Sequence, residues 1–312
     1  MNSIKTNSAA MTALQSLQMT NKELLMTQQR ISTGFRVGSA EDNAAYWSIA
    51  TTMRSDSKSL STVRDALGLG SATVDVAYTS IESAIDVASE IKAKLVAARE
   101  PGINRGAIQS ELTELQSQLA NIAGSSSFSG QNWLSVDSAS ANYNATASVV
   151  SSFSRKADGT IEIGTISVNV TNTKLYDASA SAVGILDGLR DSTGAIAASG
   201  FSVASLSIGA LSDSAGDLST LESYIMGVDK AITEMTGAAT SLGSVKQRIG
   251  LQQEFVKMLL DSIDRGISTL VDADMNEEST KLQALQVQQQ LGVQALSIAN
   301  SSSQNILALF QQ

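Results

Sequence analysis

Two stretches of the chain carry residue types that could bind a ligand, and the first has the spacing of a calcium loop. Asp272, Asp274 and Asn276 supply the first three alternating oxygen ligands that such a loop needs. The sixth position should be Gly and the twelfth Glu, but the chain has Glu277 and Gln283 there. We therefore interpret this stretch as a break between helices, with acidic residues that cap the next helix.

The second stretch, Gly68-Leu-Gly-Ser-Ala-Thr73, partly matches a phosphate-binding loop. It lies inside a helical pattern with no strand before it, so we interpret its glycines as sites of close helix packing. Asn144-Ala-Thr and Asn169-Val-Thr match the acceptor sequence for N-linked glycans. We interpret both as incidental.

Composition restricts other chemistry. The chain of 312 residues has no Cys and no His, which excludes disulfides, thiolate or imidazole metal sites and Ser-His-Asp catalysis. We predict no catalytic, cofactor or metal site. The net charge of −9 disfavours nucleic acid and anionic lipid as partners. The chain has no run of about 20 apolar residues, so we do not expect it to insert into a membrane. We also see no cleaved signal peptide at its start.

The elements that must organise this chain are long helices with a seven-residue apolar period. Such a period keeps one stripe on one side of a helix, where it packs against a partner helix. One stripe lies in each half of the chain, and we predict that the two stripes form a coiled-coil core. Its residues are Met53, Leu60, Leu67, Val74, Ile81, Leu95, Leu221, Val228, Met235, Leu242, Ile249, Val256, Ile263 and Leu270.

We expect five helices, with weaker apolar character at the two ends. The predicted ranges are 1–32, about 43–98, a short helix through 108–122, 214–270 and about 276–309. Pro101-Gly102 ends the second helix, and Ser39 with Asp42 resembles a capping box before it. The segment 136–210 is rich in Ser, Ala, Thr and Gly, and its Asp158-Gly159 pair predicts a hairpin turn. The fold class is therefore mainly α: a long antiparallel coiled-coil bundle built from both chain ends, with a small β-rich outer domain between them.

Several long motifs resemble bacterial flagellins. At the N-terminal end these are Gln29-Arg-Ile-Ser-Thr-Gly-Phe-Arg-Val-Gly-Ser-Ala-Glu-Asp-Asn-Ala-Ala-Tyr-Trp-Ser-Ile-Ala50 and Phe128-Ser-Gly-Gln-Asn-Trp-Leu134. At the C-terminal end they are Gln247-Arg-Ile-Gly-Leu-Gln-Gln-Glu-Phe-Val256, Leu270-Val-Asp-Ala-Asp-Met-Asn-Glu-Glu-Ser279 and Leu307-Ala-Leu-Phe310. The resemblance covers about 1–135 and 211–312, and its details look most like flagellins of rhizobia and agrobacteria.

The resemblance implies an extracellular filament subunit for swimming motility, exported through the flagellar type III apparatus without a cleaved signal peptide. It implies an inner domain (1–33 and 272–312), a middle coiled-coil domain (34–135 and 211–271) and a variable outer domain (136–210). The implied partners are further copies of the chain, sister flagellins, an export chaperone, the filament cap and a hook-junction protein. A hook–filament junction protein with similar terminal helices is the alternative function.

The terminal helices lack a continuous apolar stripe, so we expect them to order only between neighbouring subunits. The residues expected at subunit interfaces are Leu17, Leu24, Ile31, Tyr46, Trp47, Leu285, Leu296, Ile306, Leu309 and Phe310.

Overall fold

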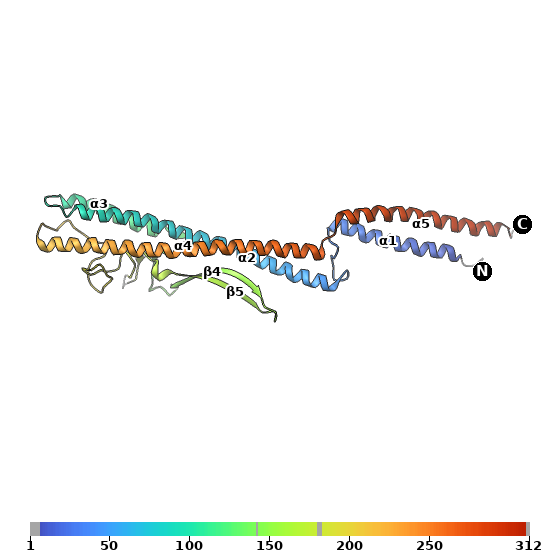
Figure 1. Ribbon diagram of the computed structural model, residues 1–312, viewed down its shortest axis with the longest axis horizontal. Coiled ribbons are helices and arrows are strands. Elements are labelled where there is room, and N and C mark those ends of the chain that lie inside the picture. Colours follow the sequence, from blue (N-terminus) through green and yellow to red (C-terminus); the bar gives the residue numbers. More distant parts are fainter. Residues whose placement is uncertain (1–6, 142, 180–182, 310–312) are drawn as a thin grey trace. The chain divides into compact units, whose positions relative to one another are not determined.

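The computed structural model describes residues 7–141, 143–179 and 183–309, with side chains described as far as Ser301. Long helices occupy both ends of the chain, so the mainly α fold is confirmed (Figure 1). They are α1 (Ser8–Thr33), α2 (Ala44–Ala97), α3 (Arg105–Ser125), α4 (Ala215–Val271) and α5 (Met275–Leu309). The chain divides into two compact units, one of residues 1–58 with 260–312 and one of residues 59–259. The three-part division into inner, middle and outer domains stays a prediction.

In the 59–259 unit, α2 and α4 run antiparallel, and three ion pairs fix their register. Lys246 Nζ lies 2.7 Å from Asp75 Oδ1, Lys92 Nζ lies 2.6 Å from Asp229 Oδ1, and Arg99 pairs with Glu222. Each step forward along α2 is matched by an equal step backward along α4. The two helices therefore keep one continuous face toward each other, as a coiled-coil seam requires.

The predicted stripe residues of this unit are deeply buried. The stripe residues from Leu60 to Leu95 and from Leu221 to Val256 are no more than 3% exposed. In the other unit, Met53, Ile263 and Leu270 are only half-buried. Apolar burial, which supplies about 1.5–3 kcal/mol for each fully buried side chain, is therefore concentrated in residues 59–259.

Helix α3 returns along the helices because of the turn after α2. Gly102 has a φ of 79°, a left-handed conformation that suits glycine, and the Asn104 side chain accepts a hydrogen bond from the Ala107 N–H and caps α3. The buried Arg105 donates to the carbonyl oxygens of Ala98 and Leu211 and pairs with Asp213. This one side chain therefore ties the α2–α3 turn to the segment that leads into α4.

The caps of the long helices differ in part from the sequence prediction. Ser214 caps α4, since its Oγ accepts from the Asp217 N–H at 3.2 Å. The predicted cap of α2 at Ser39 was wrong, because Asn43 Oδ1 accepts from the Tyr46 N–H at 3.1 Å. Asp42 instead accepts hydrogen bonds from the Ser39 and Gly38 N–H groups. These bonds, and chiefly the one from Ser39, lower the pKa of the Asp42 carboxyl group.

After α3 the chain makes a tight hairpin from β1 (Ser127–Phe128) and β2 (Gln131–Asn132). Ser129 and Gly130 both have positive φ, as a two-residue hairpin turn favours. Asn132 then fixes the exit, because its side chain donates to the Ala123 carbonyl and accepts from the Leu134 N–H. The strand β3 (Ser135–Val136) follows and pairs in parallel with β6 (Tyr176–Asp177).

The middle of the sequence holds one longer hairpin, formed by β4 (Thr146–Arg155) and β5 (Ile161–Asn169) around the predicted Asp158-Gly159 turn. A short 3-10 helix, η1 (Val170–Asn172), follows β5 directly. The hairpin packs on α2 at Gly70, where an added Cβ would lie 2.3 Å from Val149 Cγ1. The close packing expected of Gly70 is therefore with a strand, and Gly68 faces open space.

A second attachment joins residues 185–203 to α4. The Arg190 side chain is fully buried, and it donates to the carbonyls of Ile185 and Gly194 and to the carboxylate of Glu234. Phe201 lies against Tyr224, and it occupies the space where a Cβ on Gly227 would be. The strand-rich segment is thus part of the same compact unit as the helices that it covers.

A buried ion pair lies beside β6. Lys174 Nζ is 2.6 Å from Asp177 Oδ2, and both side chains are no more than 5% exposed. Burial acts to raise the pKa of Asp177, but Lys174 and the N–H groups of Ser138 and Ser179 hold it well below its ordinary value. Folding therefore favours the ionised form of this carboxyl group.

This ion pair predicts an acid-dependent loss of stability. A carboxyl group with a lowered folded pKa contributes stability that is fully present above its unfolded pKa of 3.8 and is lost as the pH falls through its folded pKa. We expect Asp177→Asn to lower the free energy of unfolding by about 3 kcal/mol at pH 7, with a difference from wild type that narrows in acid. Denaturant unfolding across pH measures it, and the exposed Asp86→Asn is the control. A difference that stays constant with pH would contradict this assignment.

Candidate assembly surfaces

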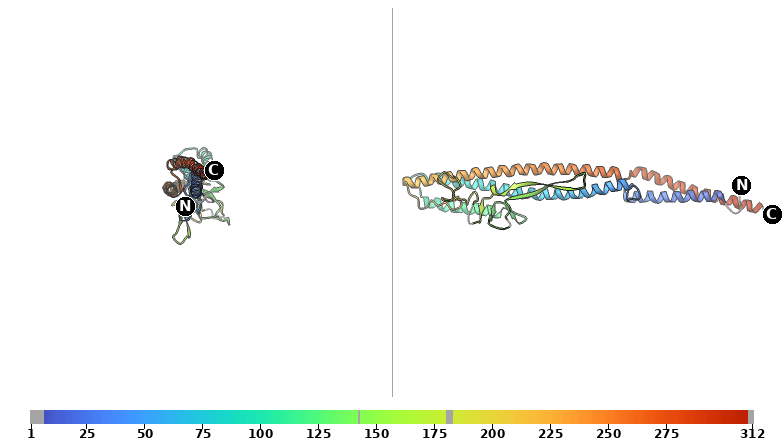
Figure 2. Two further views of the ribbon diagram at one scale, coloured as in Figure 1. Left: turned by 90° about the vertical axis from the view of Figure 1, so that its right-hand side faces the viewer. Right: turned by 90° about the horizontal axis from the view of Figure 1, so that it is seen from below.

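The terminal helices α1 and α5 lie side by side (Figures 1 and 2), and polar side chains connect them at several points. Asn7 donates to the Ala299 carbonyl, Gln289 donates to Asn21, and Arg30 NH1 lies 3.1 Å from Glu278 Oε1. Among the described side chains, α1 buries only Thr27, and α5 buries Glu278 and Leu285. This helix pair therefore has little apolar core of its own.

The predicted interface residues of these helices have mixed surroundings. Leu17, Leu24, Ile31 and Leu296 are half-buried, and Leu285 is 4% exposed. Leu285 is therefore already covered within one chain. The side chains of Ile306 and Leu309, and the whole of Phe310, lie outside the described residues.

Other apolar side chains of the two helices are exposed, and the sequence prediction missed them. They are Met11, Leu14, Met19, Leu25 and Met26 on α1, and Met275, Val287, Leu291, Val293 and Ile298 on α5. Met19 and Met26 are seven apart, as are Leu291 and Ile298, so a second heptad stripe on each helix was the available signal. A helix pair that is apolar on its outer side offers surface for further helices.

A further apolar group lies at the start of α2. Tyr46, Trp47 and Ile49 are 42%, 37% and 50% exposed, and Phe35 is nearby in sequence with the Arg54 guanidinium 5.0 Å from its ring centre. Because Asn43 caps the helix directly before them, these side chains are held at a fixed helix end. The structure thus places the predicted Tyr46 and Trp47 at the surface.

The 59–259 unit also has an exposed apolar face, on α4. Leu251, Phe255 and Met258 are spaced by four and three residues, so they lie on one side of the helix, and each is more than half exposed. The buried stripe residues Ile249 and Val256 occupy the other side. One helix thus presents an inner and an outer apolar face.

The stretches with possible ligand chemistry have structural roles. Asp274 Oδ1 accepts from the N–H groups of Asn276 and Glu277 and caps α5, as interpreted from the sequence. Asn144 and Asn169 each accept from the N–H two residues later and so hold local turns. Within the described residues, no cluster of three or more acidic side chains could hold a metal, and no helix has the length and apolarity to cross a bilayer.

Comparison with known proteins matches both ends of the chain to one family. The model of the bacterial flagellin N-terminal helical region matches residues 4–139, and that of the C-terminal helical region matches residues 225–310. Flagellin C of Rhizobium meliloti (strain 1021) is 50% identical over 323 residues, and flagellin A of the same strain is 42% identical over 397. A flagellin of Brucella melitensis is 42% identical over 312 residues. Each alignment covers 100% of both chains.

Proposed function

The chain belongs to the bacterial flagellin family. From this we infer that it assembles into a filament, and we propose which of its parts perform that assembly. The protein is a structural subunit of the extracellular flagellar filament, and it self-polymerises. Its similar relatives are named flagellins, and nothing favours the hook–filament junction alternative. We further propose that the role is structural rather than catalytic. The observation that carries the assignment of parts is the contrast between the deeply buried seam of residues 59–259 and the sparse burial between α1 and α5.

We propose that the two stripes form a coiled-coil core that keeps the middle of the subunit folded before assembly. The stripe residues between Leu60 and Val256 supply that core. Met53, Ile263 and Leu270 belong to the same predicted stripes but lie in the other unit and are less buried. In this proposal, residues 34–135 with 211–271 are the middle domain and 136–210 are the outer region. The ends, 1–33 with 272–312, form the inner domain.

We propose that α1 and α5 become stably ordered only when neighbouring subunits cover their outer apolar faces. The pair buries too few apolar side chains to offset the entropy of ordering two long helices. Leu17, Leu24, Ile31, Leu285 and Leu296 then join the two helices, while Met19, Met26, Leu291 and Ile298 contact other subunits. Tyr46 and Trp47 provide a further contact at the start of α2. An export chaperone, the filament cap, a hook-junction protein and sister flagellins are proposed partners.

This proposal predicts a large difference in amide exchange between monomer and filament. Amides of Ser8–Arg30 should exchange rapidly in the monomer and slowly in the filament, whereas those of α2 around Leu67–Leu95 should be protected in both.

Short filament seeds added to purified monomer supply the filament and also test the proposed function. Elongation of the seeds is followed by electron microscopy. Strong protection of Ser8–Arg30 in the monomer would overturn the ordering proposal, and monomer that never elongates seeds would contradict the filament role.

A further inference from the structure

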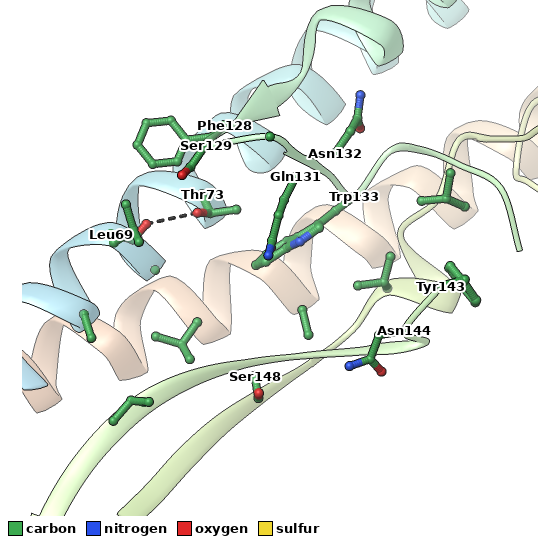
Figure 3. Close-up of a pocket in the computed structure, with 18 of the residues that line it drawn as sticks. Leu69, Thr73, Phe128, Ser129, Gln131, Asn132, Trp133, Tyr143, Asn144 and Ser148 are labelled. Carbon is green, nitrogen blue, oxygen red and sulfur yellow. Dashed lines mark hydrogen bonds between the residues drawn. The ribbon is translucent and has the colours of Figure 1, made fainter. Parts of the chain in front are cut away.

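A pocket of 650 Å³ lies in the 59–259 unit between α2, the turn after α3 and the strand β4 (Figure 3). Leu69, Gly70 and Thr73 of α2 form one wall, and residues 128–133 form a second. Residues 147–150 of β4 form a third, held against α2 by the close approach of Val149 to Gly70. Its volume lies within the range of about 300–1,000 Å³ that small-molecule sites occupy.

The described lining of this pocket is nearly free of charge. It contains no Lys or Arg, and Asp137 is its single carboxylate, which accepts a hydrogen bond from the Ala139 N–H. A phosphate would therefore lack a cationic partner, and a metal ion would lack a second carboxylate. The lining instead combines aromatic rings with side-chain amides and hydroxyls: Phe128, Trp133, Tyr143, Gln131, Ser129 and Ser148.

Polar groups of the lining are free to bind a ligand. Within the described part of the chain, the side chains of Ser129, Gln131 and Ser148 make no hydrogen bond, although they lie at the pocket. Asn132 and Thr73, in contrast, are engaged with backbone carbonyls at Ala123 and Leu69. Ser129 and Gln131 lie in the β1–β2 hairpin and Ser148 lies in β4, so these side chains line two different walls of the pocket.

Trp133 adds a further hydrogen-bond donor to the lining of the pocket. Its side chain is only 6% exposed, and its indole N–H has no hydrogen-bond partner among the described residues. Figure 3 shows the indole lying across the pocket, with the Gln131 side chain extending beside it. The indole nitrogen is not one of the fully buried side-chain atoms that lack a partner, so its N–H reaches the open space and can donate to a molecule in the pocket.

We propose that this pocket binds a neutral saccharide. Sugar hydroxyls both donate and accept, which matches the hydroxyls of Ser129 and Ser148 and the amide of Gln131. The Trp133 N–H donates to a further sugar oxygen, and the aromatic rings pack against the apolar C–H faces of the pyranose. This saccharide site is separate from the surfaces that we propose for subunit contacts, so it can exist whether or not those contacts are correct.

The test uses the two tryptophans of the chain, Trp47 and Trp133, whose indole N–H groups give separate signals in a ¹H–¹⁵N spectrum. The full-length monomer is titrated with cellobiose, maltose and lactose, and with glucose 6-phosphate as a charged comparison. We expect at least one disaccharide at millimolar concentration to shift the Trp133 signal in a saturable way. The Trp47 signal should stay unchanged. Glucose 6-phosphate should bind no more tightly than the neutral sugars. Trp47→Phe assigns the two signals and should leave binding intact.

Variants of the exposed polar residues keep the test independent of folding. Gln131→Ala and Ser148→Ala should each weaken binding several-fold at an unchanged melting temperature. Trp133→Phe, which keeps most of the apolar side chain, should weaken binding at least as much, measured by calorimetry. Failure of all three disaccharides to shift Trp133, equal shifts of both tryptophans, or unchanged binding by the three variants would overturn the proposal. If no saccharide binds and the Trp133→Phe variant elongates filament seeds slowly, the pocket binds a segment of a second copy of the chain and the saccharide proposal is wrong.

Discussion

Replacing Leu242 with Asp is expected to unfold the 59–259 unit, whereas the same replacement at Leu251 leaves the monomer folded. Leu242 is fully buried in the α4 stripe, and Leu251, on the outer face of the same helix, is 69% exposed. A carboxylate in the seam would lose its hydration without gaining a partner, which costs several kcal/mol. The milder Leu242→Ala should still cost about 2–5 kcal/mol. Circular dichroism during thermal unfolding measures both changes.

This pair of variants also separates folding from assembly. If the face of Leu251, Phe255 and Met258 contacts a neighbouring subunit, Leu251→Asp monomer should melt like wild type but elongate filament seeds at least ten times more slowly. A loss of about 1.4 kcal/mol at one interface would suffice for that factor. Elongation at the wild-type rate would remove this face from the proposed interfaces, and a wild-type melting temperature for Leu242→Asp would contradict the proposed seam.

Removing the carboxylate of Glu234 is expected to detach the 185–203 segment from α4. Arg190 is fully buried, and its NH2 group lies 2.6 Å from Glu234 Oε2. Glu234→Ala leaves that guanidinium without its anionic partner, so we expect a loss of about 3 kcal/mol in the free energy of unfolding. The free energy comes from denaturant unfolding. Cleavage near Gly194–Phe201 by a nonspecific protease reports the local opening.

A matched control comes from another ion pair of α4. Asp229 pairs with Lys92 at 2.6 Å, but both side chains are more than a third exposed. Asp229→Ala should therefore cost less than about 1 kcal/mol. The double variant Arg190→Met with Glu234→Met should be more stable than Glu234→Ala, because no buried charge remains. Equal losses for Glu234→Ala and Asp229→Ala would show that burial of Arg190 does not govern this attachment.

The helices and the hairpin turn could be predicted because their signals are local in the sequence. A seven-residue apolar period, Pro101-Gly102 and Asp158-Gly159 act over a few residues, so the structure places most elements within a few residues of expectation. The exception is α1, which was predicted from residue 1 and begins at Ser8, after the Asn7 cap. The cap of α2 was misassigned to Ser39 because both Ser39 and Asn43 are good capping residues, and only the path of the chain selects Asn43.

The mainly α fold, with helices from both ends and a short strand-rich segment between them, could be inferred without the structure. The three-dimensional packing was needed to show that Gly70 receives Val149, that Glu234 holds a buried arginine and that Trp133 lines a pocket. It also decided that Leu285 is covered while Leu291 and Ile298 are exposed. The physical reason is that periodicity fixes which residues share one face of a helix. Which of those faces becomes buried depends on segments that are distant in sequence and are brought there by folding.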